Sequence, residues 1–304
     1  MSSYPVRKER FNNIRNSWSL KQLHDLMLQY NPPIDLLEDF KNSVMLYISK
    51  AFNFSCTFDE TEFMTRLDEK RNYTKNVTPN GAVVPKKEYQ LEFNLVLRAW
   101  SKIIRQMISN DPSLLNRIRM TPNIRIKFGE ELEENYGRPL NTSIPHSDAW
   151  IDGPWGIICY TPLLGDVENN NLYHYKPIDP DNFNDDWLSL APKFEDMQWT
   201  LQYYKQSDEI IPEKGKIHLV DYALIHETHR KPKCGTRISI DTNIYIGDYE
   251  IHQDRQSEYI NEMKIFGEDL FVSTSRSIDE NQSFDKKTTF SHYTSGTLKL
   301  VNLD

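Results

Sequence analysis

The stretch Thr236-Arg-Ile-Ser-Ile-Asp-Thr-Asn-Ile-Tyr-Ile246 alternates apolar with polar side chains over most of its length. A period of two is typical of a β-strand that has one face in the core. Similar strand candidates cover residues 124–128, 157–164, 172–178 and 216–225. So many strands in succession predict an antiparallel sandwich or barrel with helices on one face.

The residues before these strands are predicted to be mostly helical. Leu20, Leu23, Met27 and Tyr30 recur at helical spacing, and Pro32-Pro33 ends that segment. Two further amphipathic helices are expected at residues 35–52 and 88–109, with a loop at 71–86 between them.

The length of 304 residues allows one domain with elaborations and a large core. Within that domain we expect four parts: a helical support at 1–120, a strand-rich core at 121–246, an Asp-, Asn- and Pro-rich insertion at 165–200 and a C-terminal extension at 247–304. Long insertions between strands are a usual place for an active-site lid.

Composition limits the class of partner. The net charge of −8 and the pI of about 5.6 make nucleic acid and anionic membranes unfavourable partners. The sequence has no long apolar run, so no transmembrane helix is expected. Three widely spaced cysteines, Cys56, Cys159 and Cys234, predict reduced thiols in a cytoplasmic protein.

A histidine and an aspartate stand two positions apart in Ile144-Pro-His-Ser-Asp-Ala-Trp150, and a second histidine follows in Leu224-Ile-His-Glu-Thr228. On a strand, His146 and Asp148 would project to the same face. Two imidazoles and one carboxylate bind Fe(II) and leave positions open for substrates and O₂, whereas zinc sites usually have four ligands or keep one water. We therefore predict that His146, Asp148 and His226 bind iron.

A second histidine competes for the distal position. His229 lies three residues after His226. We prefer His226 because it directly follows the strand candidate 216–225, whereas His229 lies in a polar segment typical of an exposed loop. The choice between the two stays open at the level of sequence.

Arg237 and Ser239 share one face of the alternating stretch. A guanidinium holds a carboxylate through two parallel hydrogen bonds, and a hydroxyl adds a third. Fe²⁺ with Asp148 leaves one positive charge and Arg237 adds another, so a dianion would neutralise both. The pair therefore predicts a site for a dicarboxylate such as 2-oxoglutarate beside the metal.

The joint pattern of His146-x-Asp148, His226 and Arg237-x-Ser239 resembles the Fe(II)- and 2-oxoglutarate-dependent oxygenases over about residues 120–246. This resemblance implies a double-stranded β-helix, a cupin-like jelly roll flanked by helices. It implies that the two histidines and the aspartate bind iron, and that the arginine and the serine bind the distal carboxylate of 2-oxoglutarate. The implied activity is that of a dioxygenase, which uses O₂, oxidises an unactivated C–H bond, usually by hydroxylation, and releases succinate and CO₂.

A longer set of residues is similar to one branch of that superfamily. The set is His146-Ser-Asp-Ala-Trp150, Gly153-Pro-Trp155, Tyr160-Thr-Pro-Leu163 and Asn169-Asn-Asn171. The branch is the one related to phytanoyl-CoA hydroxylase, and more closely its streptomycin-cluster type. That likeness implies a biosynthetic role and a small polar substrate, sugar- or aminocyclitol-like. Because halogenases of the superfamily lack the carboxylate ligand, Asp148 disfavours halogenation.

Three aromatic residues near the metal motif are candidate walls of a substrate pocket: Trp150, Trp155 and Tyr160. Trp187 and Trp199, in the insertion, are further candidates. Flat aromatic rings would suit a sugar-like substrate, although for each ring taken singly core packing is the commoner role.

Two other functions stay open. One is a jelly-roll binding or scaffold protein without catalytic activity, whose metal site is vestigial or holds a different ion. The other keeps the same chemistry but makes the substrate a protein or peptide side chain. The sequence predicts neither the substrate nor the oligomeric state.

Overall fold

The computed structural model describes residues 3–72, 77, 81–83, 89–118, 122–129, 143–152, 154–181 and 193–247. The helices are α1 (Tyr4–Trp18), α2 (Ile34–Phe52), α3 (Glu60–Glu69), α4 (Gln90–Met107) and α5 (Ala149–Asp152), with 3-10 segments η2 (Pro112–Leu114) and η4 (Glu195–Tyr203). The strands are β1 (Lys21–His24), β2 (Met27–Tyr30), β3 (Leu115–Ile118), β4 (Asn123–Lys127), β5 (Ile157–Gly165), β6 (Asn170–Pro177), β7 (Tyr204–Ser207), β8 (Ile217–Asp221), β9 (His226–Arg230) and β10 (Arg237–Ile246).

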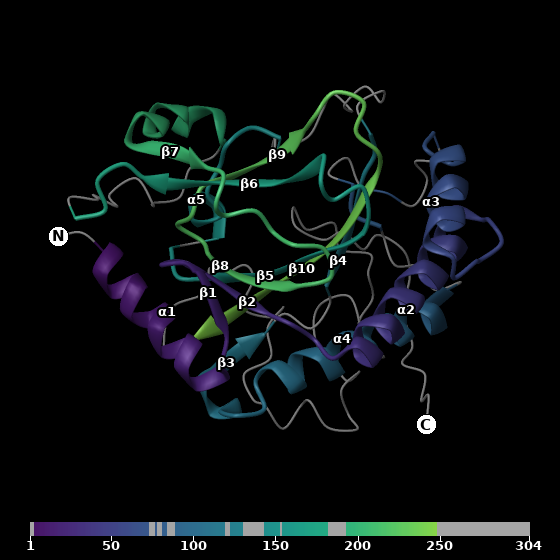
Figure 1. Cartoon of the computed structure of the whole chain (residues 1–304), viewed down its shortest axis with the longest axis horizontal. Coiled ribbons are helices and arrows are strands. Elements are labelled where there is room, and N and C mark those ends of the chain that lie inside the picture. The colour runs from purple at the N-terminus through teal and green to yellow at the C-terminus, as the bar shows by residue number, and fades with distance from the viewer. Residues whose placement is uncertain are drawn as a thin grey trace.

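These strands form two antiparallel sheets. The larger sheet has the order β1-β2-β8-β5-β10-β3, with β4 also paired to β10, and the smaller sheet has the order β7-β6-β9. In Figure 1 the smaller sheet lies above the larger one, and α2 and α4 lie on the lower right. The expectation of a mainly antiparallel protein with helices is confirmed.

Strand β10 pairs with three other strands of the larger sheet. It pairs with β5 on one side and with β4 and β3 on the other. Ile238 and Ile240 lie opposite Ile126 and Ile124 of β4, and all four belong to the same hydrophobic core as the buried residues of α2 and α4. The apolar positions of this stretch therefore lie in the core as predicted, but most polar positions of the other face are buried as well.

The opposite face of β10 is polar and turned toward the smaller sheet. It carries Arg237, Ser239 and Asp241, and the Asp241 carboxylate pairs with the guanidinium of Arg125 on β4. Arg237 Nη1 donates to the carbonyl oxygen of Asn170 on β6 at 3.2 Å, which links the two sheets. The face of β10 that is turned toward the smaller sheet thus carries polar side chains.

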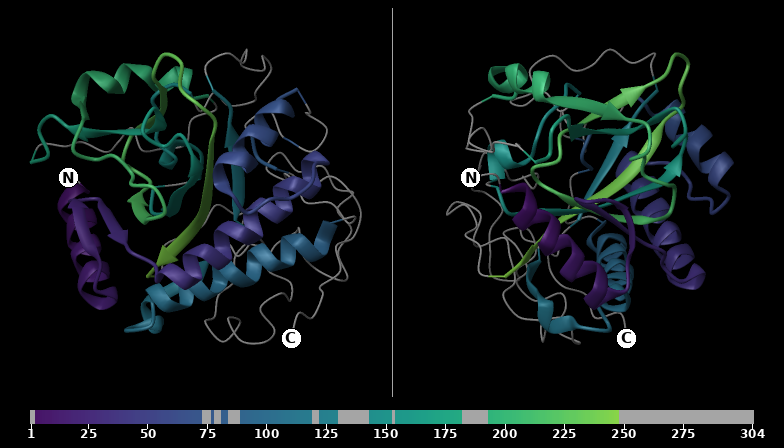
Figure 2. Two further views of the ribbon diagram at one scale, coloured as in Figure 1. Left: turned by 45° about the vertical axis from the view of Figure 1, so that its right-hand side comes forward. Right: turned by 60° about the vertical axis from the view of Figure 1, so that its left-hand side comes forward.

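Helices α2 and α4 pack side by side on the apolar face of the larger sheet, as the left view of Figure 2 shows. The rings of Phe40 and Trp100 meet between them with centroids 5.1 Å apart. Asn53, in the left-handed region at φ 55°, ends α2. The helices expected at residues 35–52 and 88–109 are confirmed, and η2 follows α4 after Asp111.

The helix expected from Leu20 to Tyr30 is wrong. These residues form the β1–β2 hairpin, and the N-terminal helix is α1, which ends at Ser19 in the left-handed region. Strand β2 pairs with β8 and buries Met27 and Leu28. A short apolar run fits the period of a helix as well as that of a strand. Here these residues form strands because they pair with the edge of the larger sheet. Helix α3 was also not predicted.

Two strand boundaries differ from expectation. The strand expected at 172–178, within the segment 165–200, is β6, which begins at Asn170 and is the central strand of the smaller sheet. The candidate 216–225 ends as a strand at Asp221, and a turn then leads to β9. Trp187 and the extension after Gly247 lie outside the described residues, as do parts of the loop at 71–86. Within the described part of the chain, no helix has the length and apolarity needed to cross a bilayer.

His218 on β8 makes the stability of the fold dependent on pH. The ring is buried, its Nε2 accepts a hydrogen bond from the Glu213 N–H at 3.2 Å, and burial lowers the pKa of His218 to about 3. Between pH 6.5 and 3 the unfolded chain binds a proton at this residue that the folded protein does not, so stability falls as pH falls through this window. From pH 6.5 to 5 the loss from this residue is about 2 kcal/mol.

We therefore expect His218→Gln, which keeps a hydrogen-bond acceptor, to show a shallower loss of unfolding free energy between pH 6.5 and 5 than the wild type. Urea unfolding at several pH values measures this slope. An unchanged slope in the variant would mean that other groups account for the acid sensitivity.

Candidate metal centre

Two segments far apart in the sequence meet at the histidines of the predicted metal site. His146 and His226, the first residue of β9, exchange two backbone hydrogen bonds of 2.9 Å each. Residues paired in this way lie directly opposite each other and project to the same face. Their ring centroids are 4.4 Å apart. The isolated bridge therefore sets the spacing of the two imidazoles.

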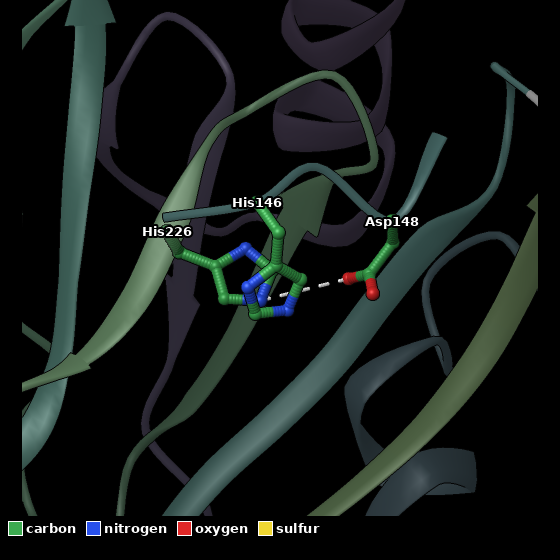
Figure 3. Close-up of side chains that lie close together, drawn as sticks. All are labelled: His146, Asp148 and His226. Carbon is green, nitrogen blue, oxygen red and sulfur yellow. Dashed lines mark ion pairs between the residues drawn. The ribbon is translucent and has the colours of Figure 1, made fainter. Parts of the chain in front are cut away.

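Asp148 completes the group. One ligand atom from each of His146, Asp148 and His226 lies within 4.8 Å of the others, and His226 Nε2 is 3.7 Å from Asp148 Oδ2. Figure 3 shows the two rings adjacent and the carboxylate directed toward them. Both imidazoles are buried, whereas the carboxylate side chain is 26% exposed. Solvent therefore reaches the group beside Asp148.

Backbone carbonyls orient both imidazoles. His146 Nδ1 is 2.8 Å from the Ile144 oxygen, and His226 Nδ1 is 3.3 Å from the Leu224 oxygen. Because a carbonyl oxygen can only accept, each Nδ1 carries a proton, so Nε2 is the ring nitrogen that could bind a metal ion. Burial, with the neighbouring His226 second, lowers the pKa of His146 well below its ordinary value. Its ring is therefore neutral, which is the form that binds metals.

The motif His146-x-Asp148 does not lie on a regular strand, so this part of the prediction is wrong. His146 forms only the isolated bridge, and Asp148 lies in a turn before α5. The Ser147 hydroxyl between them donates to the Tyr222 carbonyl oxygen at 2.6 Å and accepts from the Ala149 N–H at 3.2 Å. This anchored turn brings the two side chains together in place of strand alternation.

His229 lies apart from the group. It is on β9, three residues after His226, so the two side chains project from opposite faces of the strand. Its ring packs against Tyr173, with centroids 4.3 Å apart. The structure thus places His226 beside Asp148 and places His229 against Tyr173 of β6.

Arg237 is buried on the polar face of β10 and is 1% exposed, as is Ser239. Its Nη1 donates to the Asn170 oxygen, while its Nε has no hydrogen-bond partner among the described residues. Burial lowers the pKa of Arg237, and nearby Tyr160 partly offsets that effect. Within the described part of the chain this guanidinium forms no ion pair with a carboxylate, an arrangement that suits an incoming anion.

The predicted pocket residues lie in different places. Tyr160 is buried on β5, where burial raises its pKa and the nearby Arg237 guanidinium opposes that rise. Trp150, in α5, is fully buried. Trp155 instead packs under the guanidinium of Arg7 from α1, 4.3 Å from ring centroid to Cζ. Trp199 on η4 is 51% exposed and forms an edge contact with Tyr203.

Two residues beside the candidate metal ligands were not predicted. The ring of Phe194, just before η4, lies 4.3 Å from the ring of His146. His174 on β6 is paired in register with His226, and their ring centroids are 5.8 Å apart. His174 stood in a predicted strand, but its partner strand could not be assigned from sequence. Phe194 comes from the segment treated as an insertion and had no motif around it.

No family model and no curated protein match the chain. Several solved structures are similar to it. SnoN, a non-heme alpha ketoglutarate dependent epimerase from nogalamycin biosynthesis, shares 10% identity over 80% of this chain and 84% of its own, with a TM-score of 0.43. SnoK, a carbocyclase of the same biosynthesis, shares 12% identity over 64% and 78%, with a TM-score of 0.36. An N-substituted L-amino acid dioxygenase from Burkholderia ambifaria AMMD, in complex with alpha-KG, shares 12% identity over 78% and 87%, with a TM-score of 0.35.

Proposed function

We propose that this protein is an Fe(II)- and 2-oxoglutarate-dependent dioxygenase that oxidises a small molecule. The observation that carries the proposal is the convergence of two imidazoles and one carboxylate within 4.8 Å, from segments about eighty residues apart. The backbone bridge and the oriented Nδ1 atoms prepare these side chains to bind a metal ion.

The donor set fits non-haem iron and differs from that of a structural zinc site. A structural zinc site takes four side chains, whereas the group found among the described residues has three. Two histidines and one carboxylate with open positions suit non-haem Fe(II). His146, Asp148 and His226 would hold the ion, which when bound would supply the redox chemistry that activates O₂ with 2-oxoglutarate.

The polar face of β10 fits the second substrate. Arg237 would hold the distal carboxylate of 2-oxoglutarate with two parallel hydrogen bonds, and the Ser239 hydroxyl would add a third. Both side chains are buried, and the guanidinium has no carboxylate partner among the described residues. A dicarboxylate would neutralise this charge and the remaining charge of a bound Fe²⁺.

Aromatic residues would keep water away from one side of the site. Phe194 covers the His146 ring, and Trp150 packs against Phe194 with centroids 6.1 Å apart. Exclusion of water protects a reactive centre from side reactions. The exposed edge of Asp148 marks the side from which a substrate would enter.

The two sheets would be the halves of a double-stranded β-helix. Their strands are antiparallel, and Arg237 of one sheet bonds to Asn170 of the other across the polar interior. The metal ligands lie where the His146 bridge extends β9. This arrangement agrees with a ligand site at the mouth of a barrel.

The reaction would be hydroxylation or another oxidation of a C–H bond, with release of succinate and CO₂. Sugar- and aminocyclitol-like metabolites are the first compounds to test, with Trp150 and Tyr160 near the site as candidate contacts. Three free cysteines, two of them buried, agree with action in the cytoplasm. A protein or peptide side chain is the alternative substrate, and a non-catalytic scaffold is the alternative function.

Anaerobic titration with Fe(II) and 2-oxoglutarate tests the proposal. A weak visible charge-transfer band is expected only when both bind the same site. Succinate formation in air, screened over candidate metabolites, then identifies the substrate. A protein that binds neither iron nor 2-oxoglutarate would be a scaffold rather than this enzyme.

His226→Ala is expected to abolish iron binding, whereas His229→Ala is expected to leave it within about twofold of the wild type. The two variants form a matched pair, because both remove an imidazole from β9 and only one of these faces Asp148. Fe(II) titration followed by succinate formation measures the difference. The opposite result would assign the distal ligand to His229.

A further inference from the structure

Helix α1 carries two arginines that are buried with an aspartate of β8. Arg7 and Asp221 have side chains that are 0% exposed, and Arg7 Nη1 lies 2.7 Å from Asp221 Oδ1. Arg10 Nη1 is 3.7 Å from Asp221 Oδ2, and its side chain is 6% exposed. Buried ion pairs add little net stability, because desolvation offsets the attraction. These ion pairs are therefore more important for the positions of the segments that they join than for the stability of the fold.

The same arginines hold the loop between α5 and β5. Arg7 Nη1 donates to the Pro154 carbonyl oxygen at 2.6 Å, and Arg10 Nη2 donates to the Trp155 oxygen at 2.8 Å. The guanidinium of Arg7 also lies over the Trp155 ring. Helix α1 is thus hydrogen-bonded to the segment that follows the turn carrying His146 and Asp148.

Asp221 shapes the turn that delivers His226. Its Oδ1 accepts from the Ala223 N–H at 2.8 Å, and its carbonyl oxygen accepts from the Leu224 N–H at 3.0 Å. Two residues after Leu224 the chain reaches His226. The buried carboxylate therefore holds both the arginines of α1 and the backbone that leads into the metal ligand.

That turn also holds the other two ligands. The Tyr222 carbonyl oxygen accepts from the Ser147 hydroxyl at 2.6 Å and from the Ala149 N–H at 3.3 Å. The Tyr222 N–H donates to the Gly156 oxygen at 3.1 Å. Ser147 lies between His146 and Asp148, so one turn is bonded to both segments that supply the metal ligands.

We infer that Arg7, with Arg10, is a positioning residue of the metal centre, acting through Asp221 and the turn at 221–224 on the Ser147 hydroxyl. The inference rests on the proposed metal site. It makes α1 part of the iron-binding apparatus, although no residue of the helix is a ligand. Residues behind the ligands of a metal site typically change metal affinity 10- to 100-fold when they are removed.

Co(II), which is stable in air and has visible absorption, tests this in the full-length apo protein without any turnover. Arg7→Met and Ser147→Ala are each expected to weaken Co(II) binding tenfold or more while the protein stays folded. Lys8→Met is the matched control, since it removes a neighbouring positive charge of α1 whose side chain is 48% exposed, and it should bind Co(II) like the wild type. In the double variant the two losses should not multiply, because both break one path.

Folded Arg7→Met or Ser147→Ala protein that binds Co(II) within twofold of the wild type would overturn the inference. If Arg7→Met does not fold, Arg10→Met decides in its place, because Arg10 contacts the same aspartate at 3.7 Å and donates to the Trp155 oxygen. Wild-type protein that does not bind Co(II) would instead contradict the proposed function. Losses that multiply in the double variant would show that helix and hydroxyl act independently, which also rejects the path through the turn.

Discussion

Asp148→Ala is expected to lower the affinity for Fe(II) more than about 100-fold and to abolish succinate formation. The carboxylate is the one anionic side chain of the three-residue group found in the described part of the chain. Removal of residues that only support a ligand costs 10- to 100-fold, so removal of a ligand should exceed that range. Anaerobic Fe(II) titration with 2-oxoglutarate and a succinate assay measure both effects.

The fold should survive this substitution. Asp148 lies in a turn and is partly exposed, so truncation leaves no large cavity. Circular dichroism and thermal unfolding of the metal-free protein should match the wild type. Asp148→Glu, which keeps the charge on a longer side chain, is the control and should retain weak binding. An Asp148→Ala protein that binds Fe(II) normally would remove the carboxylate from the site and with it the proposed ligand set.

Residue type and spacing were enough to identify the side chains of the candidate site, but not the backbone structure that brings them together. His146, Asp148 and His226 were chosen because these side chains together suit Fe(II), and they converge. The strand that was expected to carry the first two is a turn held by Ser147 and Tyr222. Hydrogen bonds between remote backbone segments have no local sequence pattern, so this device could not be predicted.

The fold, like the site, was only partly predictable from the sequence. Strand β10 and helices α2 and α4 have long periodic patterns and were found. The sequence predicts a helix where the hairpin β1–β2 lies, because two four-residue strands contain too few positions to distinguish a period of two from 3.6. The buried Arg7–Asp221 pair was not found either, since charged residues on a helix are ordinarily exposed.

Arg237→Met is expected to weaken 2-oxoglutarate binding about 10- to 150-fold, which corresponds to loss of a charge-assisted hydrogen bond of about 1.5–3 kcal/mol. The effect should appear as a raised 2-oxoglutarate requirement with little change in Fe(II) affinity, because Arg237 is not in the ligand group. Arg237→Lys should recover only part of the loss, since an ammonium cannot form the parallel pair of hydrogen bonds. Lys233→Ala, which removes an exposed charge nearby, is the control and should have no effect.

The same substitution should not destabilise the protein that lacks 2-oxoglutarate. In that state the buried guanidinium donates to one acceptor among the described residues, the Asn170 oxygen at 3.2 Å, and burial already lowers its pKa. Methionine removes an uncompensated buried charge at similar volume, so Arg237→Met should unfold at the same or a higher temperature than the wild type. With 2-oxoglutarate at about 100 times its Kd the order should reverse, because the wild type gains about 2.7 kcal/mol from binding and the variant gains far less. If instead the variant is less stable without 2-oxoglutarate and binds it normally, Arg237 serves the fold and the anion site must lie elsewhere.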